Sequence, residues 1–147
     1  MIKTVGIKAG TFSIVSGGHV SCLHECKNRC DYLVCITQPD YIIKQLKGFL
    51  PPIRLPDRII ILDSIRYVDE VGVYDDKTEE KWLQEFKDTR MERDFPNAKL
   101  VMFHSEELKG RDIIPGKGIV DDIIYVPRRY ISTSTMIERL LKERANG

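Results

Sequence analysis

Residues 10–19 hold the glycines and the histidine whose types and spacing are typical of a phosphate-binding site. Gly10 follows a short apolar run, and the pair Gly17-Gly18 stands directly before His19, where a helical pattern begins. Glycines let backbone N–H groups come close to an anion, and a helix N-terminus adds roughly half a positive charge. The stretch contains neither GxGxxG nor GxxxxGK[ST], so it is neither the dinucleotide fingerprint nor the P-loop. His19 is therefore a candidate donor to phosphoryl oxygens, and the alternative is a histidine that only caps the helix.

Short apolar runs alternate along the chain with helical patterns, and these elements must position the glycine-rich stretch. Strands are expected at residues 5–7, 31–37, 70–74, 98–103 and 122–127, and helices after residue 19, from residue 55, and at residues 78–93 and 135–144. The alternation predicts a Rossmann-like α/β domain with three layers and a parallel five-stranded sheet joined by right-handed crossovers. Because ligands of such sheets bind beyond the carboxyl ends of the strands, the first, second and fifth strand ends are expected to surround one site.

Two further parts of the sequence, the helix from Leu55 and residues 104–120, need separate description. The helix from Leu55 has a proline in its first turn, where proline is well tolerated. Its apolar positions are expected to cover a broad face: Ile59, Ile60, Leu62 and Ile65. Residues 104–120 show no clear period, and only a turn is expected there, at residues 115–118.

Length and charge narrow the functional class. The 147 residues suit a single domain, residues 1–147, that is long enough for a three-layer core. The formal net charge is +1, so nothing in the composition indicates binding to nucleic acid or to an anionic membrane surface. No apolar run approaches the ~20 residues of a membrane span, and the first residues lack the pattern of a signal peptide. We expect a cytoplasmic protein.

Four cysteines stand at positions 22, 26, 30 and 35. The first three are spaced i, i+4, i+8 and would share one helix face. Two thiolates one turn apart can share a metal ion, but CxxC pairs are absent. Packing of small buried thiols between the helix and the sheet explains the pattern better, and disulfides are not expected in a reducing compartment.

Three segments carry a resemblance to a known family. Residues 10–19, GTFSIVSGGH, stand where the HxGH nucleotidyltransferases carry GTFDxxHxGH. Residues 66–71, RYVDEV, and residues 128–134, RRYISTS, match two further segments of the cytidylyltransferase branch, although the last is one residue shorter than the family's RTxGISTS and lacks its glycine. The segments occur in family order and spacing. The chain therefore resembles, over nearly its whole length, the cytidylyltransferases for glycerol 3-phosphate, phosphocholine and phosphoethanolamine.

The resemblance implies an enzyme in which a phosphate-bearing acceptor attacks the α-phosphorus of a nucleoside triphosphate in line and pyrophosphate leaves. Catalysis is then mostly positioning and electrostatic stabilisation. The implied catalytic residues are Ser16, His19, Lys44 and Lys47, although lone lysines are more often solvated surface. The implied nucleotide-binding residues are Gly10, Thr11, Phe12, Gly18 and His19, with Arg128, Ile131, Ser132, Thr133 and Ser134. The implied cofactor is Mg²⁺, with no protein metal ligand assigned.

The sequence departs from the family pattern at positions that bear on catalysis. Ser13 replaces an aspartate that in the family lies near the metal and phosphates, and Ser16 replaces the first histidine of HxGH. A serine cannot carry the charge of an imidazolium, and losing one transition-state donor typically costs ~3 kcal/mol, about a hundred-fold or more in rate. Residues 103–106 stand where the family often has GDDW, at positions that help to define the acceptor and nucleotide pockets. The specificity for the acceptor and the specificity for the nucleotide therefore both stay open. Lys8 is a candidate to supply the missing charge, and the alternative is a surface lysine.

The preferred function is transfer of CMP from CTP to a small phosphorylated alcohol or sugar by a homodimer. A nucleotide-binding protein that has lost catalysis is the first alternative, supported by the two serines, and an adenylyltransferase is the second. The RYVDEV segment lies partly at a dimer interface in the family, so Arg66 and Asp69 are expected to serve either assembly or chemistry. Arg58 is open in the same way, with a surface or interface ion pair as the alternative.

Overall fold

The computed structural model describes residues 1–128 and 132–147, and of Thr133 only the backbone. Its strands are β1 (Thr4–Ala9), β2 (Tyr32–Thr37), β3 (Glu70–Val73), β4 (Lys99–Ser105) and β5 (Asp122–Val126). Its helices are α1 (Gly17–Lys27), α2 (Asp40–Lys47), α3 (Leu55–Ser64), α4 (Glu80–Phe86), α5 (Glu92–Asp94) and α6 (Thr133–Asn146), with a π-helical turn at Lys87–Met91 and a 3₁₀ turn at Glu106–Leu108.

All strand pairs are parallel, and the five-stranded sheet of the described chain has the order β3-β2-β1-β4-β5. In the middle of the sheet Ile7 of β1 pairs with Val34 of β2 on one side and with Met102 of β4 on the other. The predicted Rossmann-like fold is confirmed. The order reverses at β1 and β4, and such a switch point opens a crevice at the carboxyl ends of the two strands. The site is thus expected beside β4, a strand that the sequence analysis did not include.

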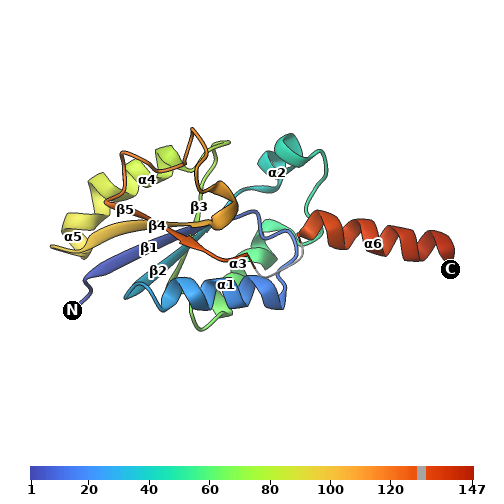
Figure 1. Ribbon diagram of the computed structural model, residues 1–147, viewed down its shortest axis with the longest axis horizontal. Helices are drawn as coiled ribbons and strands as arrows, with labels where there is room; N and C mark the ends of the chain where they lie inside the picture. Colours follow the sequence, from blue (N-terminus) through green and yellow to red (C-terminus); the bar gives the residue numbers. More distant parts are fainter. Residues whose placement is uncertain (129–131) are drawn as a thin grey trace.

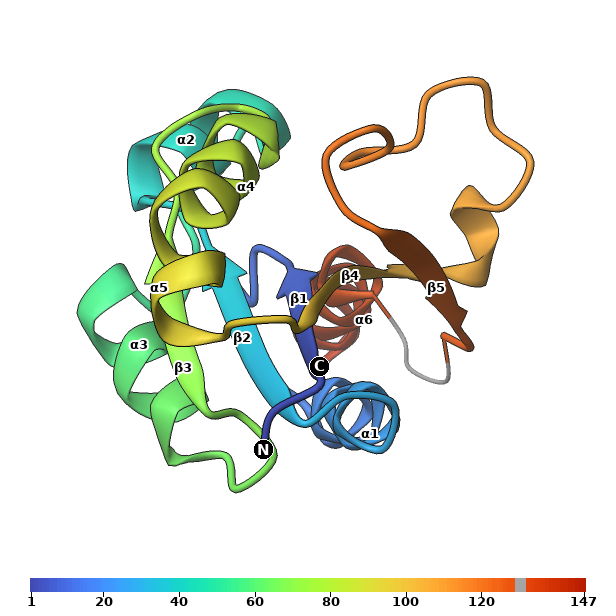
Figure 2. The same ribbon diagram turned by 90° about the vertical axis from the view of Figure 1, so that its left-hand side faces the viewer.

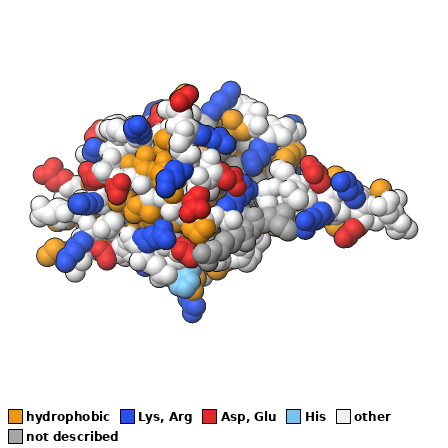
Figure 3. Space-filling model, in the orientation of Figure 1, with side chains coloured by type: hydrophobic (Ala, Val, Ile, Leu, Met, Phe, Trp, Pro, Cys, Tyr) orange, Lys and Arg blue, Asp and Glu red, His pale blue; other side chains and the backbone are white. Residues whose placement is uncertain are grey.

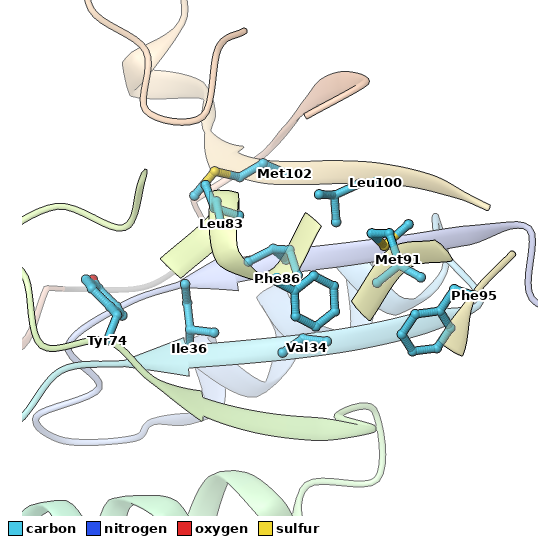
Figure 4. Packing of buried hydrophobic residues seen from close by; sticks show 11 residues of the cluster. Val34, Ile36, Tyr74, Leu83, Phe86, Met91, Phe95, Leu100 and Met102 are labelled. Carbon is cyan, nitrogen blue, oxygen red and sulfur yellow. The ribbon is translucent and has the colours of Figure 1, made fainter. Parts of the chain in front are cut away.

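Helices cover both faces of the sheet (Figures 1 and 2). On one face, side chains of β1, β2 and β4 pack against α4 and the turns that follow it, as Figure 4 shows for Leu83, Phe86, Met91 and Phe95. On the other face α1 and α3 pack through Leu23, Cys26 and Leu62. Val5 and Ile7 belong to the first cluster, and Leu33 and Cys35 to the second, so the sheet is buried on both sides as a parallel sheet requires.

The cysteines lie where core packing predicted. Cys22, Cys26 and Cys35 are buried between α1 and the sheet, and Cys30 packs at the edge of the same cluster. All four are free thiols. Gly6 of β1 allows this packing, because a Cβ at this position would lie 2.4 Å from the Phe103 ring.

The last helix is capped as the sequence predicted, although it begins two residues earlier, at Thr133. The Ser132 hydroxyl oxygen accepts a hydrogen bond from the backbone N–H of Thr135 at 3.2 Å. Figure 1 shows α6 leaving the body of the protein beyond the carboxyl end of the sheet, on the side away from the N-terminus. Over this face of the molecule positive and negative side chains are interspersed (Figure 3), in keeping with the small net charge. No helix in the described part of the chain is long and apolar enough to cross a membrane.

The helix from Leu55 faces the core differently from the prediction. Ile60, expected on the apolar face, is 65% exposed, whereas Arg58 is completely buried. The surface alternative for Arg58 is therefore wrong, and the reason lies in the contacts of its guanidinium.

Candidate active site

A cavity of about 190 Å³ lies at the carboxyl ends of β1 and β4. Its lining comes from the ends of β1 and β4, the loop after β1, the first turns of α1, the end of α2 and the segment between β5 and α6: Lys8, Ala9, Gly10, Thr11, Phe12, His19, Cys22, Leu23, Lys47, Ser105, Arg128 and Ser132. The lining holds three basic residues, Lys8, Lys47 and Arg128, and no carboxylate among the described residues. Charge of one sign in a concave site attracts anions. The residues that line the cavity therefore favour the binding of an anion.

The loop after β1 shapes one wall. Gly10 continues the sheet by donating its N–H to the Ile36 carbonyl oxygen at 3.0 Å. Phe12 then takes a positive φ of 49°, rare for a large side chain, and its buried ring lies 5.5 Å from the ring of His19. A Cβ at position 10 would lie 2.7 Å from the Phe12 ring, so the glycine is needed for this close approach.

His19 is held by the residue that caps its helix. The backbone N–H of Ser16 donates to His19 Nδ1 at 3.1 Å, and the Ser16 hydroxyl lies 3.0 Å from the same nitrogen. Because an N–H can only donate, Nδ1 accepts, and a neutral ring then carries its hydrogen on Nε2. Burial, together with the charges of Lys8 and Arg128, lowers the pKa of His19 to about 4. His19 is thus a neutral hydrogen-bond donor at pH 7.

Ser13 and Ser16 take different places. Ser16 reaches the site through His19. Ser13 is 1% exposed, its Oγ has no hydrogen-bond partner in the described structure, and its carbonyl accepts from the Ile53 N–H at 3.3 Å. It does not line the described cavity, so the hydroxyl at this position does not stand in for the family's carboxylate.

Arg58 fastens the loops around the cavity. Its five N–H groups donate to the carbonyl oxygens of Thr11, Gln38 and Ile53, to Thr37 Oγ1, and to Asp40 Oδ1, at distances between 2.7 and 3.0 Å. The guanidinium therefore satisfies every donor and forms a salt bridge with Asp40. The loop after β1 and the loops before α2 and α3 meet on this one side chain. The sequence left the role of Arg58 open, because its acceptors are mostly backbone carbonyls.

The two lysines of α2, Lys44 and Lys47, line different pockets. Lys47 lines the cavity, whereas Lys44 lies in a neighbouring open groove with Tyr41, Leu50 and Leu55. Both side chains are exposed. One helical turn on α2 is enough to direct the two lysines to different surfaces.

The C-terminal motif contributes in part. Arg128 lines the cavity and donates to Glu107 at 3.1 Å, and Ser132 lines it at the start of α6. Ser134 is exposed and Gly18 lies in the first turn of α1, both outside the described lining. Ile131 lies outside the described residues, as does the side chain of Thr133.

Sequence reasoning did not place several lining residues in the site, among them Ala9, Cys22 and Leu23. Lys8, which the sequence analysis named as a candidate for the missing charge because it is a charged residue near the end of an apolar strand, is half-buried and lines the cavity. Ser105, at the end of β4, lies within residues 103–106, which the resemblance connected with specificity, but its place beside β1 depends on strand order, which is not readable from one sequence. His104 next to it is buried, and its Nε2 donates to the Pro115 carbonyl at 2.7 Å.

Asp69 and Arg66 of the RYVDEV segment make contacts with other residues of the same chain. Asp69 forms a salt bridge with Lys27 and accepts from the Leu33 N–H at 2.8 Å. Arg66 is exposed and donates to the Tyr67 hydroxyl at 2.7 Å. Neither residue lines the described cavity.

The described residues do not fit a metal held by the protein. They contain no group of three or more His, Cys, Asp or Glu side chains placed to hold an ion, and no carboxylate among them lines the cavity. Carboxylates are the side chains that hold Mg²⁺. Magnesium chemistry is therefore not assigned to any side chain of this site.

The match to a family model defines the class. The cytidylyltransferase-like family matches residues 7–139, and the chain belongs to this family. The sequence resemblance and the nucleotidyltransferase class that it implied are confirmed.

Relatives agree with this class. The bifunctional protein HldE of Granulibacter bethesdensis is 32% identical over 139 residues, which cover 93% of this chain and 27% of that protein. HldE of Aliarcobacter butzleri is 28% identical over 142 residues, again 27% of its length. The chain thus spans about a quarter of these curated relatives.

Solved structures share the fold. A lipopolysaccharide core biosynthesis protein from Thermoplasma volcanium has a TM-score of 0.66 at 17% identity, over 88% of this chain and 100% of that one. A putative nicotinate-nucleotide adenylyltransferase from Vibrio parahaemolyticus has a TM-score of 0.55 at 17% identity, over 96% of this chain and 88% of that one. At these identities the likeness concerns the fold alone.

Proposed function

We propose that the protein transfers CMP from CTP to the phosphate of a small alcohol or sugar and releases pyrophosphate. The observation that carries the proposal is the cavity at the β1–β4 switch point, lined by Lys8, Lys47 and Arg128 with no carboxylate among its described lining. A triphosphate and a phosphorylated acceptor together bring many negative charges to one place, and this lining compensates them. Family membership supports the reaction class.

The reaction needs no covalent intermediate. An oxygen of the acceptor phosphate attacks the α-phosphorus, and the bond from the α-phosphorus to the bridging oxygen breaks. The bonding electrons leave with pyrophosphate. Negative charge grows on the α-phosphoryl oxygens and on the leaving group, so donors fixed in advance lower the barrier.

Each side chain has a role in this proposal. His19 donates from Nε2 to an α-phosphoryl oxygen, since its Nδ1 is already occupied by Ser16. Arg128 offers a planar fork to the triphosphate, and Ser132 marks the α6 N-terminus, whose N–H groups favour anions. Lys47 approaches from α2.

Mg²⁺ remains part of the proposal as an ion that enters with the nucleotide. It usually keeps several waters and binds substrate phosphates. This role asks for no carboxylate from the protein. Assembly as a homodimer and a cytoplasmic location also stay predictions.

Pyrophosphate release tests the proposal. CTP, ATP, GTP and UTP are each combined with glycerol 3-phosphate, phosphocholine, phosphoethanolamine and sugar phosphates, with Mg²⁺ present, and binding of each nucleotide is measured by calorimetry. We expect binding and turnover with CTP. Turnover with ATP instead would establish the adenylyltransferase alternative, and CTP binding without turnover would establish the binding protein. Absence of binding by every triphosphate would remove all three.

A further inference from the structure

Lys8 occupies an uncommon place for a cation. It lies near the end of the central strand β1, where its backbone pairs with Cys35 of β2 and Phe103 of β4. The side chain is half-buried, whereas Lys47 and Arg128 in the same cavity are exposed. Lys8 is thus the more deeply placed of the three basic residues.

The ammonium of Lys8 is only partly satisfied. It donates one hydrogen bond, to the Ala9 carbonyl oxygen at 3.3 Å. An ammonium has three donors. No carboxylate in residues 1–128 or 132–147 lies within 4.0 Å of it, although Arg128 has Glu107 as an ion-pair partner at 3.1 Å. A charge drawn out of water without a counter-ion is costly, and an anion in the cavity would offset that cost.

The charge of Lys8 is felt by the residues around the cavity. It lowers the pKa of His19 and of His104, in each case after the larger effect of burial. His19, at the start of α1, lines the same cavity, and Arg128 and Ser132 reach it from the region of β5 and α6. Lys8 is therefore close enough to His19 to act on the same ligand in this cavity.

We propose that Lys8 is a catalytic residue whose ammonium contacts the α-phosphoryl group during transfer and supplies the positive charge that Ser16 cannot. The proposal rests on the proposed function. No proton moves through Lys8 in this role; its ammonium stabilises charge while the acceptor oxygen bonds to the α-phosphorus and the pyrophosphate oxygen departs. Ser16 is a positioning residue, which acts on the reaction through His19.

This arrangement divides two tasks between two residues. A second imidazolium at position 16 would combine a hydrogen bond with a charge. Here the neutral ring of His19 provides a directed hydrogen bond, and Lys8 provides the charge from the end of β1.

The variants Lys8→Met and Lys8→Arg test the proposal. Methionine has a similar length without the charge, and arginine keeps the charge. The matched control is Lys99→Met, because Lys99 is exposed at the opposite end of β4. Measured quantities are kcat for pyrophosphate release, the dissociation constant of CTP by calorimetry, and the melting temperature.

We expect Lys8→Met to lower kcat by about 10²–10³-fold, the usual effect of losing one donor to a developing oxyanion. The melting temperature should be unchanged or higher, since the substitution removes an uncompensated charge. CTP affinity should fall by less than kcat, and Lys8→Arg should recover part of the rate. Lys99→Met should behave as the unmodified protein.

The outcomes separate the two proposals. A kcat of Lys8→Met within threefold of the unmodified protein would overturn the role of Lys8 and leave the proposed function standing. A loss of rate that merely follows a lower melting temperature, with no recovery in Lys8→Arg, would make Lys8 structural. If the unmodified protein shows no turnover with any of the acceptors, the proposed function fails, and the catalytic role of Lys8 fails with it.

Discussion

His19 Nδ1 accepts the backbone N–H of Ser16 at 3.1 Å, so the residue in the place of the family's first histidine orients the second one. The main chain makes this bond, and any residue at position 16 that keeps the helix start can make it. The Ser16 hydroxyl adds a second contact to the same nitrogen. The orientation of His19 is therefore robust to substitution, while the charge at position 16 is what the sequence change removed.

His19→Ala should reduce turnover by about 10²–10³-fold, because the donor to the α-phosphoryl oxygen is lost. The ring also packs against Phe12, so some stability is lost as well. Steady-state rates and thermal melts separate the effects. A large fall in melting temperature with normal specific activity would show that His19 is structural.

Stability should rise with pH across the titration of His19. Its pKa is about 4 in the folded protein and 6.5 in the unfolded chain, so the unfolded chain binds more protons between these values. The contribution of neutral His19 to the stability of the folded protein is complete above pH 6.5 and is lost as the pH falls toward 4. Denaturant melts between pH 4 and 8 measure it, with His19→Gln as the comparison. The variant should show a shallower pH dependence, with the remaining slope partly from His104, whose pKa burial also lowers; an identical slope would contradict the assignment.

How far the sequence predicts this molecule depends on whether a feature is local. The glycines at 10, 17 and 18 and the alternating patterns indicated the fold, and Ser132 indicated its helix cap. Ile60, expected on the apolar face, is exposed and Arg58 is buried instead, because backbone carbonyls from distant loops bind the guanidinium and outweigh the periodicity of one helix. Ser105 joins the site only because β4 lies beside β1, a fact of strand order.

Arg58→Met should destabilise the protein by about 3–5 kcal/mol, the usual result of removing one partner of a buried ion pair. Asp40 would lose its partner, and three carbonyl oxygens would lose a donor. Urea unfolding measures the effect, with Arg66→Met, at an exposed arginine, as the matched control. Equal stability of the two variants would mean that the network adds little. If Arg58→Met remains folded, CTP binding should weaken, because the loop after β1 is no longer fastened.

Cys22 should be the cysteine most reactive to alkylation near neutral pH, and CTP should protect it. The neighbouring Cys26 thiol and the charge of Lys8 lower the pKa of Cys22, although burial opposes them, and the Cys22 thiol lines the cavity. Burial raises the pKa of Cys30 to about 11 and that of Cys35 to about 12. Mass spectrometry after a short iodoacetamide pulse identifies the site, and Cys22→Ala is the control. Faster labelling of Cys30, or no protection by CTP, would contradict this placement of the nucleotide.

Ser16→His should help the protein more when Lys8 is absent than when it is present. If one positive charge beside the α-phosphate suffices, an imidazole at position 16 adds little to the unmodified enzyme and restores a large part of the rate of Lys8→Met. The gain in that background could approach the hundred-fold value of one oxyanion donor. The four proteins form a double-mutant cycle, and residues that share a task are not additive in such a cycle. Equal gains in both backgrounds would mean that Lys8 and position 16 act independently.

Addition of Ser13→Asp to these variants is the last experiment. Because Ser13 is buried outside the described cavity lining, an aspartate there should lower the melting temperature without raising the rate. A rate increase from Ser13→Asp would show that the carboxylate still reaches the phosphates, and that the loop after β1 moves when the nucleotide binds.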